Sequence, residues 1–322
     1  MATYDLAAVT TILDVAKMTN GKDLLEVAQV LHKKNGLFRT AHMEEANQIT
    51  GHVLTKEVKL PSGTWRGVNQ GTVAGNYQTE QVTEAIGRVE GRSEMDEYLI
   101  DITPDPLEFR RKHDLGHMEG YMQDVVNAFL YGTPTTNINQ PRGIQPRRAT
   151  TAGGNVQSAG ASGGTSLYIC QWGPQKLSMI YPRGKAGEIV KEEDMGRHLV
   201  ITDTTTGAAL FKFITRFYSM FGIAVYDDRA IQRIANIGTA AANNVDLDQL
   251  LWALDSLPDP EDMSGAVIYC NRVTRFQIEK ALRNRPNIIT QSVDQYGRQV
   301  TGIRGVPLVM MEGISTSETT VS

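Results

Sequence analysis

One stretch of the chain, residues 105–131, constrains the fold more than any other because it reads as a single long helix with both ends marked. Asp105 is a favourable N-cap residue, and Pro106 suits the first position of a helix. Gly132 and Pro134 follow the stretch and stop a helix. At 1.5 Å per residue such a helix is about 40 Å long, well beyond the usual three or four turns. We therefore expect it to lie across a sheet as a spine.

The two sides of this helix differ in polarity. Apolar residues recur at alternating steps of three and four, which places one apolar stripe along the helix. The opposite side carries charged and amide side chains, so we expect it to be exposed to solvent or to face a polar partner. Gly116 and Gly120 predict the close approach of another backbone. The stripe consists of Leu115, Met118, Met122, Val125 and Phe129, and the polar side of Arg110, Arg111, Lys112, Asp114, Glu119, Gln123 and Asn127.

Charge limits the partners that the chain can bind. The sequence has 322 residues, 41% of them hydrophobic, which is enough for a core and more than one sub-domain. Lys and Arg number 32 against 36 Asp and Glu, for a formal net charge of −4. Without a bulk basic field, contact with nucleic acid is expected to be local, weak and non-specific. The first residues lack a basic start and the apolar runs are short or broken by charges, so we expect neither a signal peptide nor a membrane contact.

A hairpin is predicted before the long helix. Residues 52–60 alternate like a strand, residues 61–63 break it, and residues 71–89 supply a second extended run. Polar side chains occupy both faces of that second run, so neither face can be buried. A polar two-stranded hairpin is marginal alone in water. If ordered, it requires a partner surface, most simply another copy of the chain. A disordered loop is the alternative.

A segment rich in Gly, Pro and Ser follows the helix, at residues 133–164, with Arg142, Arg147 and Arg148 in its middle. Its glycines invite comparison with loops that cradle phosphate. The segment lacks the Lys-Ser/Thr ending of a P-loop and the preceding strand of a dinucleotide-binding motif. We expect a mobile surface loop and keep nucleotide binding as the alternative.

The sequence offers little that could perform chemistry. His113 and His117 have the spacing of a metal-binding pair, but a third ligand and a catalytic Glu are missing, so solvated side chains are expected. The acidic run 192–194 lacks the apolar pocket that a hydrolytic carboxylate pair needs and reads as a solvated turn. Cys170 and Cys270 lie far apart in apolar runs and are expected to be buried free thiols. We predict no catalytic residue, no cofactor and no metal, and therefore no enzyme.

Strands and helices mix in the rest of the chain. Residues 5–18 and 22–34 read as two short amphipathic helices of an N-terminal arm. Two later helices are predicted at residues 246–256 and 272–283, the first capped by Asp246 and the second by Asn271. This mixture indicates an α+β protein whose helices pack on mixed or antiparallel sheets. The expected strands lie at residues 166–172, 177–181, 198–202, 209–218, 223–226, 266–270, 288–293 and 306–311.

Two runs of sequence resemble a known family. Residues 165–174 read Thr-Ser-Leu-Tyr-Ile-Cys-Gln-Trp-Gly-Pro, and residues 179–187 read Met-Ile-Tyr-Pro-Arg-Gly-Lys-Ala-Gly. They are similar to the major capsid proteins of tailed, mainly short-tailed, double-stranded DNA bacteriophages. In that family a strand ends in Trp-Gly-Pro, and Ile-Tyr-Pro-Lys-Gly and Lys-Ala-Gly follow. Residues 222–231 and 305–309 resemble further pieces, and the resemblance covers most of residues 1–311.

The resemblance implies the capsid fold of phage Hong Kong 97. In much of the family the strand similar to residues 305–309 comes earlier in the chain. We therefore expect a rearranged connectivity in which the peripheral strands precede the axial helices. The implied parts are an N-terminal arm at 1–50, an extended loop at 51–100, a peripheral domain with the spine helix and the Gly-rich loop at 101–164, peripheral strands at 165–235, and an axial domain with C-terminal strands at 236–322.

The implied function is self-assembly as hexamers and pentamers into an icosahedral shell that encloses packaged double-stranded DNA. Such a protein resides in the virion and assembles in the bacterial host cytoplasm, with scaffold, portal and cement proteins as further partners. Two alternatives remain open. An encapsulin-like compartment protein shares the fold, and an enzyme with a Gly-rich ligand loop is of a different class.

The extended loop is then expected to lie over an adjacent subunit. Trp65 and Tyr77 are its largest apolar anchors, and Glu80 and Glu84 are candidates for polar contacts. Some relatives join a loop Lys to a neighbouring subunit covalently. Here residues 68–86 contain no Lys, so we expect non-covalent assembly. On the spine helix, Arg110 and Arg111 are further candidates for contacts between subunits.

Overall fold

The computed structural model describes residues 19–20, 23–24, 35–185, 191–201, 207–239, 243–283, 289–293 and 299–322. These residues form two compact units. The first, called the spine unit, contains Arg88–Val126 and the described parts of Met1–Lys33 and Gly187–Met220. The second, called the large unit, contains the described parts of Lys34–Gly87, Asn127–Ala186 and Phe221–Ser322.

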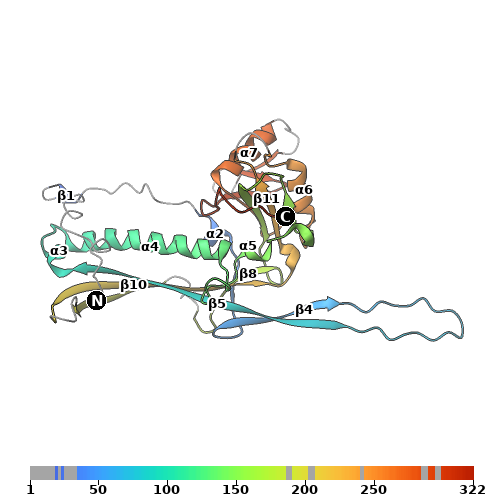
Figure 1. The fold of residues 1–322 in the computed structure, drawn as a ribbon, viewed down its shortest axis with the longest axis horizontal. Coiled ribbons are helices and arrows are strands. Elements are labelled where there is room, and N and C mark those ends of the chain that lie inside the picture. Colours follow the sequence, from blue (N-terminus) through green and yellow to red (C-terminus); the bar gives the residue numbers. More distant parts are fainter. Residues whose placement is uncertain are drawn as a thin grey trace. The chain divides into compact units, whose positions relative to one another are not determined.

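The predicted spine helix is confirmed as α4, Pro106–Tyr131, which has 26 residues. Its N-cap is Asp105, whose Oδ1 accepts a hydrogen bond from the backbone N–H of Glu108 at 3.2 Å. In the spine unit α4 lies along three strands (Figure 1), and the short helix α3, Glu97–Asp101, precedes it. The strands are β5 (Gln78–Asp96), β9 (Lys191–Ile201) and β10 (Ala209–Val225).

The packing of α4 differs from the predicted apolar stripe. Phe109 and Val125 are buried as expected of core residues, but Leu115 is 41% exposed. Asp114, predicted on the wet side, is buried and accepts a hydrogen bond from Thr215 of β10 at 2.9 Å. The prediction of a wet polar side was therefore wrong at this position, because β10 supplies a polar partner that the helix sequence alone cannot reveal.

A glycine does bring two elements of the spine unit close together, but not the predicted ones. Among the residues that the structure describes, no atom lies within 4 Å of the positions where side chains of Gly116 and Gly120 would begin, so this part of the chain does not supply the expected close approach. At Gly91 of β5 a Cβ would lie 1.9 Å from the ring of Tyr121. Only glycine leaves room for this ring to lie against the strand. Tyr121 also packs on Phe217 of β10, with ring centroids 5.8 Å apart.

The strand β10 is longer than predicted and accounts for two expected strands, 209–218 and 223–226. It pairs antiparallel with β9 through residues 209–218 and with β8, Leu177–Tyr181, through residues 222–225. The acidic run 192–194 lies within β9 and was wrongly predicted as a turn. Its charges are tolerated in a strand because cations stand beside them: Glu193 lies 3.7 Å from Arg216 and 2.9 Å from Lys191.

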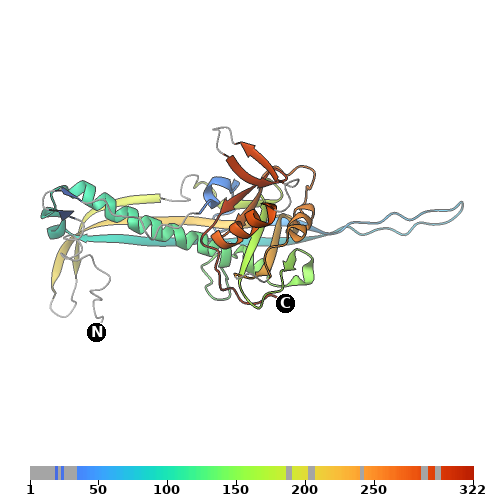
Figure 2. The same ribbon diagram turned by 90° about the horizontal axis from the view of Figure 1, so that it is seen from above.

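The large unit also contains a sheet of seven strands, which two helices cover (Figure 2). Both helices begin at their predicted caps. Asp246 accepts from the N–H of Asp248 at 3.1 Å before α6, Leu247–Asp255. Asn271 accepts from the N–H of Thr274 at 2.9 Å before α7, Arg272–Arg283. The strands, in sheet order, are β13 (Ile289–Val293), β14 (Gln299–Ile303), β15 (Val306–Met310), β12 (Ala266–Cys270), β7 (Thr165–Gln171), β11 (Ile231–Ile237) and β6 (Val156–Ser158).

The chain passes between two sheets at the Trp-Gly-Pro motif. β7 and β11 belong to the seven-stranded sheet. β8 and β10 belong to a six-stranded sheet together with β3 (Met43–Glu45), β4 (Gly51–Lys59), β5 and β9. After β7, Gly173 and Gln175 adopt positive φ angles of 155° and 61°, which turn the chain into β8. The predicted peripheral strands 165–235 thus divide between two sheets. Which of them are peripheral in a shell stays a prediction.

A buried ion pair ties the C-terminal residues to the seven-stranded sheet. The side chains of Arg233 and Glu318 are 1% and 4% exposed, and their charged atoms lie 2.8 Å apart. Ser166 accepts a further hydrogen bond from Arg233 Nε at 3.0 Å. Nearby, the Asn236 side chain bonds both the carbonyl and the N–H of Val321, at 2.7 and 2.9 Å. These contacts compensate the cost of burying charge next to a strand.

Most of the predicted N-terminal arm, including residues 5–18, lies outside the described residues. The helix predicted at 22–34 was wrong at two positions, because Asp23–Leu24 forms a strand, β2, which pairs with β1, Thr19–Asn20. A four-residue helix, α2, follows at Leu37–Thr40. Within the described ranges, no helix has both the length and the hydrophobicity that crossing a bilayer requires.

The two cysteines are buried free thiols, as predicted. Burial raises the pKa of Cys170 and of Cys270 to about 12, so both remain protonated and shielded near neutral pH. We expect a thiol reagent at pH 8 to label neither cysteine in the native protein and both in denaturant. Mass spectrometry of the labelled chain measures this, and rapid labelling of either residue without unfolding would contradict the buried placement.

Candidate subunit interface

The predicted hairpin is confirmed at its base, whereas the extended run expected from residue 71 forms a strand only from Gln78 onward. β4 and β5 pair antiparallel from Gly51 opposite Ala85 to Lys59 opposite Gln78. The base of the hairpin packs into the large unit through a small apolar cluster that includes Leu54, Ile180 and Ala224. The hairpin therefore begins in a core, although its outer part has none.

Polar contacts hold the base of the hairpin in one position. Asn47 acts as a clamp on β4: its side chain donates to the carbonyl of Val53 at 2.7 Å and accepts from the N–H of Val53 at 2.9 Å. Lys56 forms an ion pair with Asp228 at 3.1 Å. The Lys at the base is thus engaged within its own chain.

The strongest contact at the base joins Glu84 to Arg147. Two guanidinium nitrogens of Arg147 each lie 2.6 Å from a different carboxylate oxygen of Glu84, and the two side chains are 9% and 8% exposed. Arg147 ends a short helix, α5, Ile144–Arg147, within the Gly-rich segment. That segment is therefore fixed here rather than mobile. Its Arg148 is also engaged, donating to the carbonyl of Ile231 at 2.9 Å, so neither of these two cations is presented to a phosphate.

This pair corrects the prediction made for Glu84. A carboxylate buried against Arg147 supports the fold of its own subunit and is not exposed to a neighbour. Glu80, four residues further out on β5, is exposed and remains a candidate for contact. Of the two arginines on α4, Arg110 forms an ion pair with Asp194 inside the spine unit. Arg111 is 73% exposed and lies 3.6 Å from Glu108, so only Arg111 remains available.

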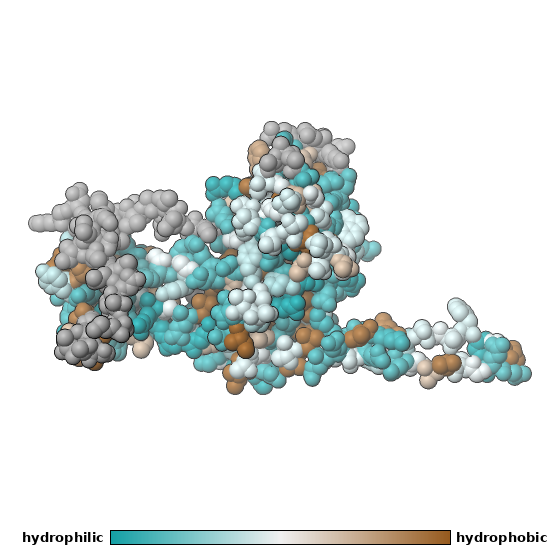
Figure 3. All heavy atoms as spheres, in the orientation of Figure 1, coloured by the Kyte–Doolittle hydropathy of each residue, from teal (hydrophilic) through white to brown (hydrophobic). Residues whose placement is uncertain are grey.

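Beyond its base, the hairpin exposes apolar side chains in an unusual concentration. We call residues 58–77 the hairpin tip; no strand is formed between residues 60 and 77. Figure 3 shows brown apolar atoms distributed along the extended hairpin. Soluble monomers rarely expose so much apolar surface unless it binds something. The exposed fractions are 59% for Val58, 66% for Leu60, 103% for Trp65, 93% for Val68, 83% for Val73 and 51% for Tyr77.

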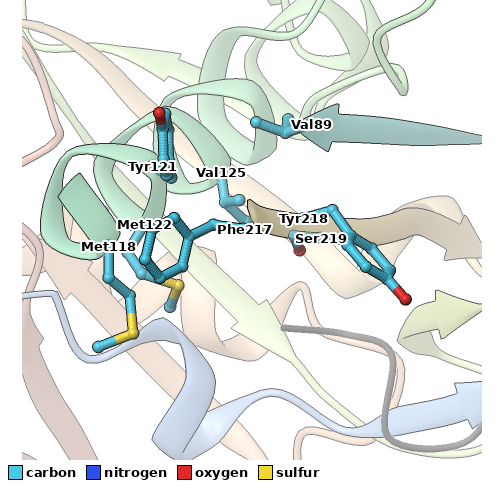
Figure 4. Close-up of a pocket in the computed structure, with 8 residues that line it drawn as sticks. All are labelled: Val89, Met118, Tyr121, Met122, Val125, Phe217, Tyr218 and Ser219. Atoms are coloured by element: carbon cyan, nitrogen blue, oxygen red, sulfur yellow. The ribbon is translucent and has the colours of Figure 1, made fainter. Parts of the chain in front are cut away.

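The spine unit contains a shallow cleft between α4 and the strands β5 and β10 (Figure 4). It has about 260 Å³ of empty space, part of it open to solvent. The lining offers three hydroxyl groups and no carboxylate, imidazole, amine or thiol, so it has no group suited to acid–base catalysis near neutral pH. The lining residues are Val89, Met118, Tyr121, Met122, Val125, Phe217, Tyr218 and Ser219.

The histidine pair on α4 is half-buried rather than solvated, which corrects the prediction. The rings of His113 and His117 lie 4.7 Å apart, and His113 Nδ1 is 3.0 Å from the hydroxyl of Ser93 on β5. Burial, together with the neighbouring His113, lowers the pKa of His117. Among the residues that the structure describes, no group of three or more His, Cys, Asp or Glu is arranged to hold a metal ion.

Asp114 gives the spine unit a dependence on pH. Burial acts to raise the pKa of Asp114, but the nearby His113 and Ser93 side chains, the hydrogen bond from Thr215 and the charge of Arg110 outweigh it and lower the pKa. A lowered pKa in the folded state stabilises the protein above the unfolded pKa of about 4, and this stabilisation is lost as pH falls below it.

We therefore expect Asp114→Asn to lower the stability at pH 7 by about 1–3 kcal/mol, because the hydrogen bonds to a charged acceptor are lost. The difference from the wild type should shrink as pH falls from about 5 to 3. Thermal unfolding across that range measures it, and a difference that stays constant with pH would rule out the proposed ionised state.

The Glu84–Arg147 pair yields a second test. Glu84→Gln leaves Arg147 buried without a compensating charge, so we expect a loss of about 3–5 kcal/mol in unfolding free energy. Glu80→Gln on the same strand is the matched control and should change it by no more than about 0.5 kcal/mol, because Glu80 is exposed. Denaturant unfolding of both variants provides the comparison. Equal stabilities would show that the pair does not hold the base of the hairpin.

Comparisons with known proteins give a family and a similar fold. The family model described as major capsid protein GP7 matches residues 19–322. The chain resembles a chain of the solved structure of bacteriophage Epsilon15 with a TM-score of 0.72 and 20% sequence identity, covering 100% of this chain and 99% of that one. It also resembles the bacteriophage JBD30 capsid with a TM-score of 0.46 and 8% identity, covering 88% and 93% of the two chains. No curated protein matches the sequence.

Proposed function

Because the chain belongs to the major capsid protein GP7 family, we propose that its copies assemble as hexamers and pentamers into an icosahedral shell around packaged double-stranded viral DNA. The observation that carries this proposal is the hairpin tip. Its apolar side chains have no core of their own, and a shell offers each tip a neighbouring copy to cover it. The likeness of fold to a chain of bacteriophage Epsilon15 over the whole length supports the same conclusion.

We further propose that the hairpin, residues 51–99, acts as a non-covalent clamp between subunits. Trp65 and Tyr77 are its apolar anchors, and Glu80 supplies a polar contact at the rim. Arg111 is the corresponding candidate on the spine helix. Residues 68–86 contain no Lys, and the two lysines of the hairpin, Lys56 and Lys59, lie at its root. Lys56 is also paired with Asp228, so the hairpin is poorly equipped to form a covalent link.

Membership of the family also suggests where the chain acts and with which partners. We propose that the chain acts in the virion by assembly rather than by catalysis, after shells form in the host cytoplasm. Scaffold, portal and cement proteins are the expected partners. With a formal net charge of −4, the chain is expected to touch the packaged DNA only weakly and without sequence preference.

Trp65→Ala tests the clamp. Trp65 is fully exposed, so its removal should leave the fold of the subunit intact. The yield of shells should fall, because truncation of an aromatic anchor typically lowers the binding free energy of an interface by about 2 kcal/mol or more, which is about 30-fold in affinity. Glu80→Ala is the control and should have a small effect, because single polar contacts at a rim contribute about 0–1 kcal/mol.

Sedimentation and negative-stain microscopy measure shell yield, and circular dichroism checks the fold. A denaturing gel of wild-type shells should show single chains and no ladder of cross-linked multimers. Normal shells from Trp65→Ala, or unfolded Trp65→Ala protein, would argue against the clamp. Failure of the wild type to form any closed particle would argue against the shell itself.

A further inference from the structure

The C-terminal residues contact the seven-stranded sheet as an irregular segment. We call residues 313–322 the strap. Apart from a single bridge, in which the N–H of Glu318 donates to the carbonyl of Gly164 at 2.7 Å, the strap has no regular strand or helix. A segment with so few regular backbone bonds opens at a lower free energy than the sheet that it contacts. The strap can therefore detach while the sheet remains folded.

Two buried side chains hold the strap in place. Val321 packs in a small apolar cluster with β6 and β11. The carboxylate of Glu318 accepts a hydrogen bond from Tyr131, the last residue of α4, at 2.7 Å and another from Ser166 of β7. It also lies 2.8 Å from Arg233 Nη2. The strap thus supplies the negative charge that the buried Arg233 requires.

The guanidinium of Arg233 is bonded on both sides. While Nη2 binds Glu318, Nη1 donates to the carbonyl of Arg148 at 2.7 Å. The guanidinium is a rigid planar fork, so its position relative to one partner fixes its position relative to the other. Arg233 therefore connects the strap to the Gly-rich segment, in which Arg148 follows the short helix α5.

The same part of the Gly-rich segment holds both strands of the hairpin at their base. Arg147 binds Glu84 of β5 through two hydrogen bonds of 2.6 Å. The neighbouring Arg148 donates to the carbonyl of Asp228, whose carboxylate pairs with Lys56 of β4 at 3.1 Å. A continuous series of polar contacts within the large unit thus runs from the strap to β4 and β5.

We propose that the strap is a latch for the hairpin. When the strap is docked, Glu318 holds Arg233, and Arg233 holds the backbone beside the two arginines that fix the hairpin base. When the strap detaches, Arg233 loses its compensating charge, turns away and releases the carbonyl of Arg148, so the hairpin base loosens. The role of the latch in assembly rests on the proposed shell function, because a loosened hairpin should form shells poorly. The coupling itself belongs to the single subunit.

Hydrogen exchange on the unassembled full chain tests the coupling. Glu318→Gln removes the charge that holds Arg233. The reporters at the hairpin base are the N–H groups of Val53 and Ile86, which donate to the Asn47 side chain at 2.9 Å and to the carbonyl of residue 50 at 3.0 Å. We expect both to exchange at least about fivefold faster in the variant, since coupling between sites typically amounts to about 5- to 150-fold. The N–H groups of β12, an inner strand of the seven-stranded sheet, should change little.

The coupling must also act in the opposite direction, because a coupling free energy is reciprocal. Glu84→Gln at the hairpin base should therefore speed exchange of the N–H of Glu318 in the strap. Val321→Ala loosens the strap without leaving a charge uncompensated, so it replaces Glu318→Gln if that variant fails to fold, and its effect on the hairpin base should have the same direction. Thr320→Ala, at an exposed position of the strap, is the matched control and should change neither site.

The outcomes separate the latch from the shell function. Unchanged exchange at the hairpin base in the strap variants would overturn the latch. Equal acceleration in β12 would do the same, because it would show a general loss of stability. Shell yield is measured on the same variants by sedimentation, and normal yield despite a loosened hairpin base would overturn the role of the latch in assembly. If the coupling is found but the wild type forms no closed particles, the latch stands and the shell function fails.

Discussion

The buried ion pair between Glu84 and Arg147 fixes the base of the hairpin to the core of the large unit. A two-stranded ribbon cannot bury its own side chains, so its direction depends on what holds its base. The carboxylate and guanidinium meet through two parallel hydrogen bonds of 2.6 Å in a buried setting, the strongest geometry for such a pair. β5 begins where the exposed tip ends, at Gln78, and carries Glu84 of the anchored base six residues further along. A fixed base therefore lets the apolar tip remain extended and available for a partner.

Buried polar pairs also connect separate elements within each of the two units. In the spine unit, Asp114 bonds Thr215, and Lys212, only 2% exposed, lies 2.9 Å from Glu94. In the large unit, Arg233 and Glu318 join the C-terminal residues to the seven-stranded sheet. A buried charge without its partner costs several kcal/mol, whereas the pair itself contributes little net stability. Such pairs favour one arrangement over others. The chain thus buries paired charges beside its apolar cores and leaves a set of apolar side chains exposed on the hairpin tip.

Features that depend on neighbouring residues, such as helix caps and apolar strands, were predicted from the sequence. α4 and α7 begin at their predicted caps, β8 and β12 match their apolar runs, and the fold class is confirmed. The sequence also predicted that the hairpin needs a partner, because neither of its faces is apolar. It did not predict the role of Glu84, whose partner is 63 positions away, since no spacing rule links distant residues. For the same reason Asp114 was wrongly placed in solvent. Long-range pairing decides which polar residues are buried, and a single sequence does not record it.

The stiffness of the hairpin base bears directly on how copies assemble. In a heterologous contact the angle between the two surfaces of one copy sets the rotation to the next, and only certain rotations close. A tip on a loose base would sample many angles and produce open or irregular assemblies. The clamps from Asn47, Lys56 and Glu84 restrict the hairpin within its own unit. These contacts join residues of one subunit and set the direction in which the hairpin leaves its base. We therefore expect closure of a shell to depend on polar contacts inside each subunit as well as on the apolar contacts between subunits.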